Sequence, residues 1–190
     1  GKRFLPGFSS RVYVPECDCD VELRFNRDGL RGPDRPHAAP PGAKRVAVVG
    51  DSMVAAIATA EERTLARVLE QRLRASRPGA AWDVINAGVS GDTSADGLRR
   101  ANWALEGDVR LLILALGAND ALRGLPARQM RDNLQGIIHR ARQRGIPVLL
   151  AGMEAPPNYG EQYAAEVRQV FQELARENKA TLVPFLLAYI

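Results

Sequence analysis

The chain has 190 residues, of which 46% are hydrophobic and 25% are charged. This length and composition favour one globular domain and exclude a disordered or coiled-coil chain. No apolar run approaches the roughly 20 residues needed to cross a bilayer, and the 26 basic and 22 acidic residues are scattered along the sequence. We therefore expect no integral membrane segment and no nucleic-acid partner.

Residues 1–44 are rich in proline and are expected to form an extension rather than part of the core. Within the extension, residues 21–25 alternate apolar and polar side chains, which predicts one short strand, and residues 26–29 (Asn-Arg-Asp-Gly) predict the turn after it. Cys17 and Cys19 are separated by one residue and no second pair exists. Neither a zinc site nor a disulfide framework is therefore expected.

From residue 45 onward, short apolar runs alternate with amphipathic segments, which is typical of a parallel sheet covered by helices on both faces. Strands are predicted over residues 45–50, 82–87, 109–117, 147–152 and 180–184. Three of the helices between them carry one apolar stripe each: Leu65, Val68, Leu69 and Leu73; Met130, Leu134, Ile137, Ile138 and Ala141; and Tyr163, Val167, Val170, Phe171 and Leu174. The expected fold class for residues 45–190 is α/β, a flavodoxin-like three-layer α/β/α domain with a five-stranded parallel sheet.

The residues best suited to catalysis follow the first three predicted strands. Ser52 follows the first strand, Gly91 lies in the loop after the second, and Asn119 follows the third. Because the carboxyl ends of parallel strands meet at one edge of a sheet, we expect these residues to lie together. A serine hydroxyl at the amino end of a helix suits developing negative charge, while Gly91 and Asn119 would offer N–H donors to an oxyanion. Each residue alone could be an ordinary cap or turn residue, so the prediction depends on their common placement.

Other residues near these positions have a supporting or binding role in this interpretation. Asp51 and Asp120 are expected to cap a helix and to fix a loop, which is a structural role. A wall that contacts substrate is expected to include Met53, Met153, Glu154 and Tyr159, with Val54, Leu122 and Pro156 as further apolar candidates. The same apolar residues would also fit a core, and Glu154 would also fit a solvated loop. No metal site and no organic cofactor are expected.

The motifs resemble those of the SGNH (GDSL) hydrolase superfamily. Residues 48–52 (Val-Val-Gly-Asp-Ser), 86–93 (Asn-Ala-Gly-Val-Ser-Gly-Asp-Thr) and 117–120 (Gly-Ala-Asn-Asp) are similar to its first three blocks. Residues 122–124 and 156–160 resemble the bacterial thioesterase/lysophospholipase/arylesterase branch in particular. Residues 26–32 (Asn-Arg-Asp-Gly-Leu-Arg-Gly) look instead like a box that precedes the first block in other bacterial members.

The resemblance implies a serine hydrolase that acts on a small-molecule ester or thioester through an acyl-enzyme on Ser52. It also implies an oxyanion hole built from the Ser52 amide, Gly91 and Asn119. In the superfamily the base is a histidine in an Asp-x-x-His block beyond the fifth strand, and this chain has no counterpart. We therefore expect residues 45–190 to be a C-terminally incomplete SGNH domain with impaired turnover.

The two histidines of the chain are poor substitutes for that base. Asp34 and His37 have the Asp-x-x-His spacing, but His37 precedes the first strand and enters the sheet on the side opposite Ser52. His139 points away from the apolar stripe of its own helix and should face solvent.

An incomplete domain would also leave an apolar face uncovered. The residues expected to form this exposed patch, and to favour self-association, are Leu182, Phe185, Leu186, Leu187 and Ile190. The chain does not begin with Met, which leaves open an upstream targeting segment and, with it, the compartment.

Two other functions are alternatives to hydrolysis. A non-catalytic domain could use the same pocket to hold an acyl or acetylated glycan group. A nucleotide or flavin binder is disfavoured, because the loop after the first strand has no glycine-rich cradle for phosphate.

Overall fold

The computed structural model describes residues 4–15 and 18–188 of the chain. Strands and helices alternate from β3 onward, and the two strands before β3 belong to the extension. The strands are β1 (Ser9–Val14), β2 (Cys19–Arg24), β3 (Ala43–Gly50), β4 (Ala81–Gly88), β5 (Val109–Ala115), β6 (Val148–Ala151) and β7 (Thr181–Val183). The helices are α1 (Ser52–Ala55), α2 (Leu65–Ser76), α3 (Ser94–Ala104), α4 (Ala118–Leu122), α5 (Ala127–Gln143) and α6 (Gly160–Asn178), with single 3-10 turns η2 (Glu61–Arg63) and η3 (Pro157–Tyr159).

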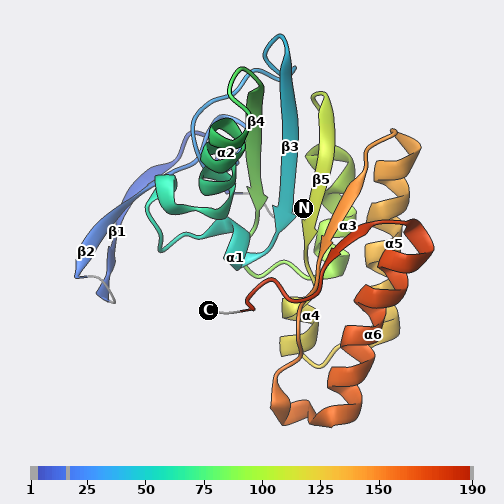
Figure 1. Cartoon of the computed structure of the whole chain (residues 1–190). Coiled ribbons are helices and arrows are strands. Elements are labelled where there is room, and N and C mark those ends of the chain that lie inside the picture. Colours follow the sequence, from blue (N-terminus) through green and yellow to red (C-terminus); the bar gives the residue numbers. More distant parts are fainter. Residues whose placement is uncertain (1–3, 16–17, 189–190) are drawn as a thin grey trace.

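Five parallel strands form the main sheet in the order β4-β3-β5-β6-β7. This is the flavodoxin-like order, so the expected α/β/α architecture is confirmed. In the sheet, β4 lies on one side of β3, and β5, β6 and β7 follow in order on the other side. Because crossovers are right-handed, α2 packs on one face, while α3, α5 and α6 pack side by side on the other (Figure 1).

The core lies on both sides of β3, whose residues 45–50 are all buried. The predicted stripes of α5 and α6 are buried as expected, apart from the half-buried Tyr163. The stripe of α2 is less buried than expected. Leu65 and Val68 are each 37% exposed, whereas Ala66 and Glu70 are buried on this helix. The side chain of Glu70 takes an inward position because Arg35 of the extension and the backbone N–H of Val84 in β4 contact it there.

The extension contains an antiparallel hairpin of β1 and β2, rather than the single strand predicted over residues 21–25. The hairpin lies beside the β4 edge of the domain (Figure 1). Cys19, at the start of β2, is disulfide-bonded, whereas no disulfide was expected from the sequence.

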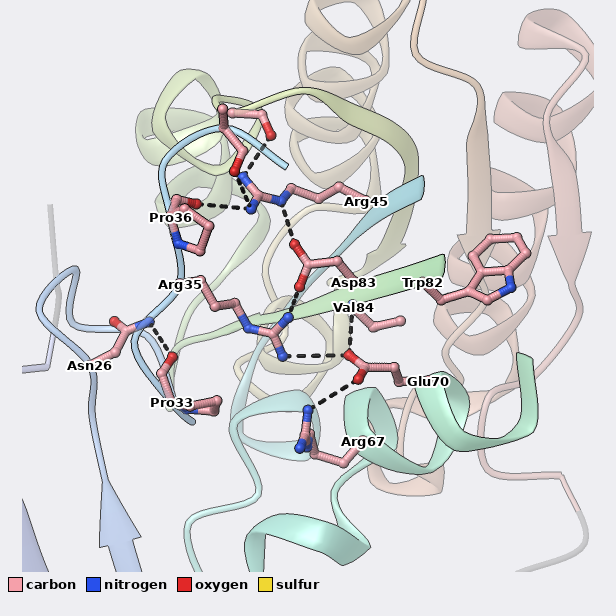
Figure 2. Close-up of polar contacts among 12 residues, drawn as sticks. Asn26, Pro33, Arg35, Pro36, Arg45, Arg67, Glu70, Trp82, Asp83 and Val84 are labelled. Carbon is pink, nitrogen blue, oxygen red and sulfur yellow. Dashed lines mark hydrogen bonds and ion pairs between the residues drawn. The ribbon is translucent and has the colours of Figure 1, made fainter. Parts of the chain in front are cut away.

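A buried arginine fixes the rest of the extension to the sheet (Figure 2). Arg45, near the start of β3, donates from Nε to Asp83 of β4 at 2.7 Å. Its other two nitrogens donate to carbonyl oxygens, which include those of Pro36 at 2.9 Å, of His37, and of Gly107 at 2.7 Å. Residues 36–37 therefore lie at the amino ends of β3 and β5, the edge opposite Ser52.

A second arginine of the extension continues this network. Arg35 pairs with the other carboxylate oxygen of Asp83 and contacts Glu70 of α2 at 3.5 Å. Glu70 also accepts a hydrogen bond from the backbone N–H of Val84 at 2.9 Å. The extension is thus packed onto β3, β4 and α2 by buried charges. Among the described residues, no helix is long and apolar enough to cross a membrane.

Candidate active site

Ser52 is the first residue of α1, directly beyond the carboxyl end of β3, and it is exposed. Asp51 forms the N-cap, and its Oδ1 accepts a hydrogen bond from the backbone N–H of Met53 at 3.0 Å. Helix α1 approaches β4 closely at Gly88, the last residue of that strand. A Cβ on Gly88 would lie only 2.2 Å from the backbone nitrogen of Ala55. Only glycine fits there, and it lets helix α1 pack directly on β4.

The loops that carry Gly91 and Asn119 meet at the same edge. The side-chain amide of Asn119, on α4 after β5, donates to the carbonyl oxygen of Asp92 at 2.9 Å. The N–H of Val89 donates to the carbonyl oxygen of Gly50 at 3.0 Å, which joins the Gly91 loop to the turn that leads into Ser52. Gly91 itself has a φ of +78°, a left-handed conformation that favours glycine.

A buried arginine that sequence reasoning missed ties these loops together. Arg100, on α3, donates from Nε to Asp92 Oδ2 at 2.6 Å, from Nη1 to the carbonyl of Ala87 at 2.8 Å, and from Nη2 to the carbonyl of Gly50 at 2.9 Å. One guanidinium therefore fixes the ends of β3 and β4 and the loop after Gly91. Arg100 comes three residues after Gly97 and four residues before Ala104, which are both buried on α3. Positions three or four apart share one face of a helix, so this spacing was the signal that could have predicted the burial of Arg100.

Two buried aspartates support the site in the structural way expected. Both carboxylate oxygens of Asp120 accept hydrogen bonds from Ser94, one from its backbone N–H at 2.7 Å and one from its hydroxyl at 2.5 Å. This contact fixes the loop after β5 to the start of α3. Burial raises the pKa of Asp51 above its usual value, and the nearby carboxylates of Asp92 and Asp120 raise it further. Asp51 Oδ2 is buried and has no hydrogen-bond partner among the described residues.

The predicted substrate wall is only partly at the surface. Met153 is 2% exposed and, like Val54, lies in the hydrophobic core, which corrects its expected role in contacting substrate. The stretch after β6 turns inward at Met153 instead of continuing along the rim. Met53 is half-buried, and Glu154 is exposed beside an open hollow of about 540 Å³ at the start of α6.

Tyr159 connects the two segments that suggested a particular branch of the superfamily. It is 41% exposed, and its hydroxyl donates to the carbonyl of Leu122 at 3.0 Å. Its ring lies over Gly124, where an added Cβ would approach the ring to 2.6 Å. The segment around residue 159 thus supports the loop after α4, which follows Asn119.

Neither histidine reaches this edge of the sheet. Both side chains are exposed, and His37 lies at the amino ends of the strands through the contact of its carbonyl with Arg45. His139 is the thirteenth residue of α5, about 18 Å along a helix that runs back toward the amino edge. Across the described residues, no group of three or more His, Cys, Asp or Glu side chains could hold a metal ion.

The arrangement offers one exposed hydroxyl and several hydrogen-bond donors. Within the described part of the chain, no acceptor takes the backbone N–H of Ser52 or Gly91. One N–H of the Asn119 amide is used on Asp92, and the second is left for another acceptor. A nucleophile beside such donors is suited to acyl transfer.

Comparisons with known proteins show the family of the chain. The family model described as "GDSL-like Lipase/Acylhydrolase family" matches residues 48–189. The chain is 40% identical over 146 residues to an esterase, TesA, of Pseudomonas aeruginosa, covering 76% of this chain and 72% of the relative. It is 32% identical over 154 residues to an arylesterase of Vibrio mimicus, covering 80% and 76%.

Solved structures give the same result. The SGNH-hydrolase family esterase AlinE4 is 39% identical, with a TM-score of 0.73, and the match covers 78% of this chain and 79% of that one. A crystal structure of TesA matches with a TM-score of 0.71 at 39% identity, covering 76% of this chain and 79% of that one. The chain therefore belongs to the GDSL-like lipase/acylhydrolase family of SGNH serine hydrolases.

Proposed function

We propose that the chain cleaves carboxylic esters or thioesters of small molecules through an acyl-enzyme on Ser52. The observation that carries this proposal is the meeting of three loops, in which Asn119 bonds the residue after Gly91 and the Gly91 loop bonds the residue two before Ser52. The names of the relatives, esterase and arylesterase, support the same chemistry.

The reaction follows from the groups at this edge. The Oγ of Ser52 attacks the carbonyl carbon and gives its proton to a base, while the carbonyl oxygen becomes an oxyanion that the N–H groups of Ser52, Gly91 and Asn119 stabilise. Collapse of the tetrahedral intermediate breaks the bond to the leaving alcohol or thiol, which takes up the proton. Water then attacks the acyl group by the same route and frees Ser52.

The proton acceptor is not a histidine of the described residues, because both histidines lie away from Ser52. We infer that the 190-residue chain alone turns over slowly. Joining it to an Asp-x-x-His segment of the kind found in the superfamily should raise the rate, since loss of one member of a serine triad costs several powers of ten.

Hydrolysis of p-nitrophenyl butyrate tests this proposal, with the Ser52→Ala variant as the matched control. The extended protein should release nitrophenol, and Ser52→Ala should abolish that release. Intact-mass measurement after treatment with a fluorophosphonate should show one adduct, absent from Ser52→Ala. Equal rates for the extended protein and its Ser52→Ala variant would refute the proposal.

A second candidate is a binding domain that holds an acyl or acetylated glycan group without cleaving it. A domain that only binds needs no base, and among the described residues both histidines lie away from Ser52. It predicts that esters bind to the wild-type chain and to Ser52→Ala with equal affinity, and that neither the chain nor its extended form gives a covalent adduct.

We also propose self-association through the C-terminal apolar face. Leu182, Phe185 and Leu186 are half-buried and Leu187 is 38% exposed, while Ile190 lies outside the described residues. Sedimentation of the wild-type chain should show oligomers that a Leu187→Lys substitution weakens, and a wild-type monomer at all concentrations would contradict this proposal.

A further inference from the structure

The loop formed by residues 26–32 has no part in the chemistry above, yet its own bonds hold it in one shape. The side chain of Asn26 accepts hydrogen bonds from the N–H groups of Asp28 at 3.0 Å and Leu30 at 2.9 Å, and it donates to the carbonyl of Pro33 at 3.2 Å. Gly29 has a φ of +71°, which permits the turn. The loop therefore brings its sixth residue, Arg31, to a fixed place.

Arg31 connects the extension, to which it belongs, with helix α1. Its backbone pairs with Asn86 of β4, and its side chain is buried. The guanidinium donates to the carbonyl oxygens of Ala55, at 3.4 Å, and of Ala56 and Thr59. These are the last residue of α1, its C-cap, and a residue of the following loop. Arg31 thus contacts the end of the helix whose first residue is Ser52.

Helix α1 depends on contacts of this kind because it has only four residues. A helix this short satisfies few of its own backbone groups. Its C-cap, Ala56, has a φ of +47°, a left-handed conformation that is unfavourable for a residue other than glycine. The carbonyl of Val54 accepts a hydrogen bond from Asn86 at 2.8 Å, and those of Ala55 and Ala56 are held by Arg31. A positive charge at the carboxyl end of a helix is also electrostatically favourable.

We propose that Arg31 is a positioning residue for Ser52, so that the extension is part of the active site. The proposal rests on the function proposed above, since it takes Ser52 as the nucleophile. Without the guanidinium, the carboxyl end of α1 is free to shift, and the Ser52 hydroxyl and amide shift with it. The hydrogen bonds of the Arg31 guanidinium in the described structure go to backbone carbonyl groups at and beyond the carboxyl end of the helix, away from Ser52. Its loss should therefore change the rate of acyl transfer rather than the binding of substrate.

The test compares Arg31→Met with a matched control, Arg27→Met. Arg27 is an exposed arginine of the same loop, and its side chain donates to the carbonyl of Arg35 at 2.9 Å. In the extended protein, Arg31→Met should lower kcat for p-nitrophenyl butyrate by about 10²-fold with KM unchanged. In hydrogen exchange, the N–H groups of Ala55 and Ala56 should exchange about tenfold faster or more, as expected from loss of a hydrogen bond to a charged group. Arg27→Met should change neither.

The outcomes separate positioning from simple stabilisation. If Arg31→Met melts earlier but its folded form keeps the wild-type kcat, the role is only structural and the proposal is wrong. If Arg31→Met does not fold, Arg31→Lys decides. Lysine keeps the charge, but its compact ammonium lacks the planar fork with which the guanidinium reaches all three carbonyl groups. A wild-type kcat and wild-type exchange in Arg31→Lys would therefore overturn the proposal.

Failure of the proposed function gives a different pattern. If Ser52→Ala cleaves the ester as fast as the wild type, the hydrolase assignment fails. The exchange comparison still decides the role of Arg31 in that case. If the N–H groups of Ala55 and Ala56 exchange faster in Arg31→Met but not in Arg27→Met, Arg31 stabilises the end of α1. Unchanged exchange in Arg31→Met shows that it does not.

Discussion

Replacement of Arg100 by methionine should destabilise the protein more than replacement of any exposed arginine. The pair with Asp92 is buried, with side-chain exposures of 5% and 0%. Methionine keeps much of the apolar stem but leaves the carboxylate of Asp92 without the guanidinium and removes a donor from each of two carbonyl groups. Breaking a buried ion pair by removing one partner costs about 3–5 kcal/mol. That cost is a large part of the total stability of a typical domain.

The free energy of unfolding in urea, followed by tryptophan fluorescence, measures this cost. The matched control is Arg99→Met, because Arg99 is the next residue, its side chain is 63% exposed, and it pairs with Asp96 at the surface. An exposed pair contributes less than about 1 kcal/mol, so this control should be nearly neutral.

A double variant identifies the cause of the loss. Adding Asp92→Asn to Arg100→Met removes the buried negative charge that the guanidinium of Arg100 compensated, so it should recover part of the lost stability. A cost below about 1 kcal/mol for Arg100→Met, or no recovery in the double variant, would refute the role given to this ion pair.

Two further substitutions test the site directly. The raised pKa of Asp51 means that the folded protein binds a proton there more tightly than the unfolded chain, whose value is near 3.8. The wild type should therefore lose stability relative to Asp51→Asn as the pH rises from about 4 through the folded-state pKa; parallel pH profiles in urea unfolding would contradict this. Asn119→Ala should lower kcat of the extended protein by about 10²–10³-fold with little change in KM, as for loss of an oxyanion donor; a loss below about tenfold would argue that Asn119 serves only to bond Asp92.

The sequence predicted the sheet well because buried parallel strands are short, apolar and regularly spaced. The strand expected over residues 82–87 is β4, Ala81–Gly88, and the one expected over 147–152 is β6, Val148–Ala151. The placement of Ser52 and Asn119 followed from the same pattern, because both come directly after a strand. The missed strand β1, Ser9–Val14, lies in the proline-rich extension, and its pairing with β2 depends on a contact that composition does not reveal.

Burial of polar side chains was the main feature that the sequence could not predict. An arginine is expected at the surface, and only the carbonyl groups that surround it in the folded chain make its burial favourable. Arg31 and Arg100 each have such carbonyl partners, contributed by segments distant in sequence. Met153 is the opposite case, since a residue after a strand was expected at the rim but packs into the core instead.

Three buried arginines share one role in this protein. Arg31, Arg45 and Arg100 each donate to carbonyl groups where a regular element begins or ends: at the end of α1, in the linker before β3, and at the carboxyl ends of β3 and β4. The strands place these segments near one another, but parallel pairing ends where the strands end. A planar guanidinium presents five N–H donors in a fixed fork and so reaches carbonyl groups of separate segments, whereas the lysine ammonium is a compact group with three donors. The rim that holds Ser52 is therefore fixed largely by side chains from the extension and α3, and variation in those elements should alter its chemistry without touching substrate.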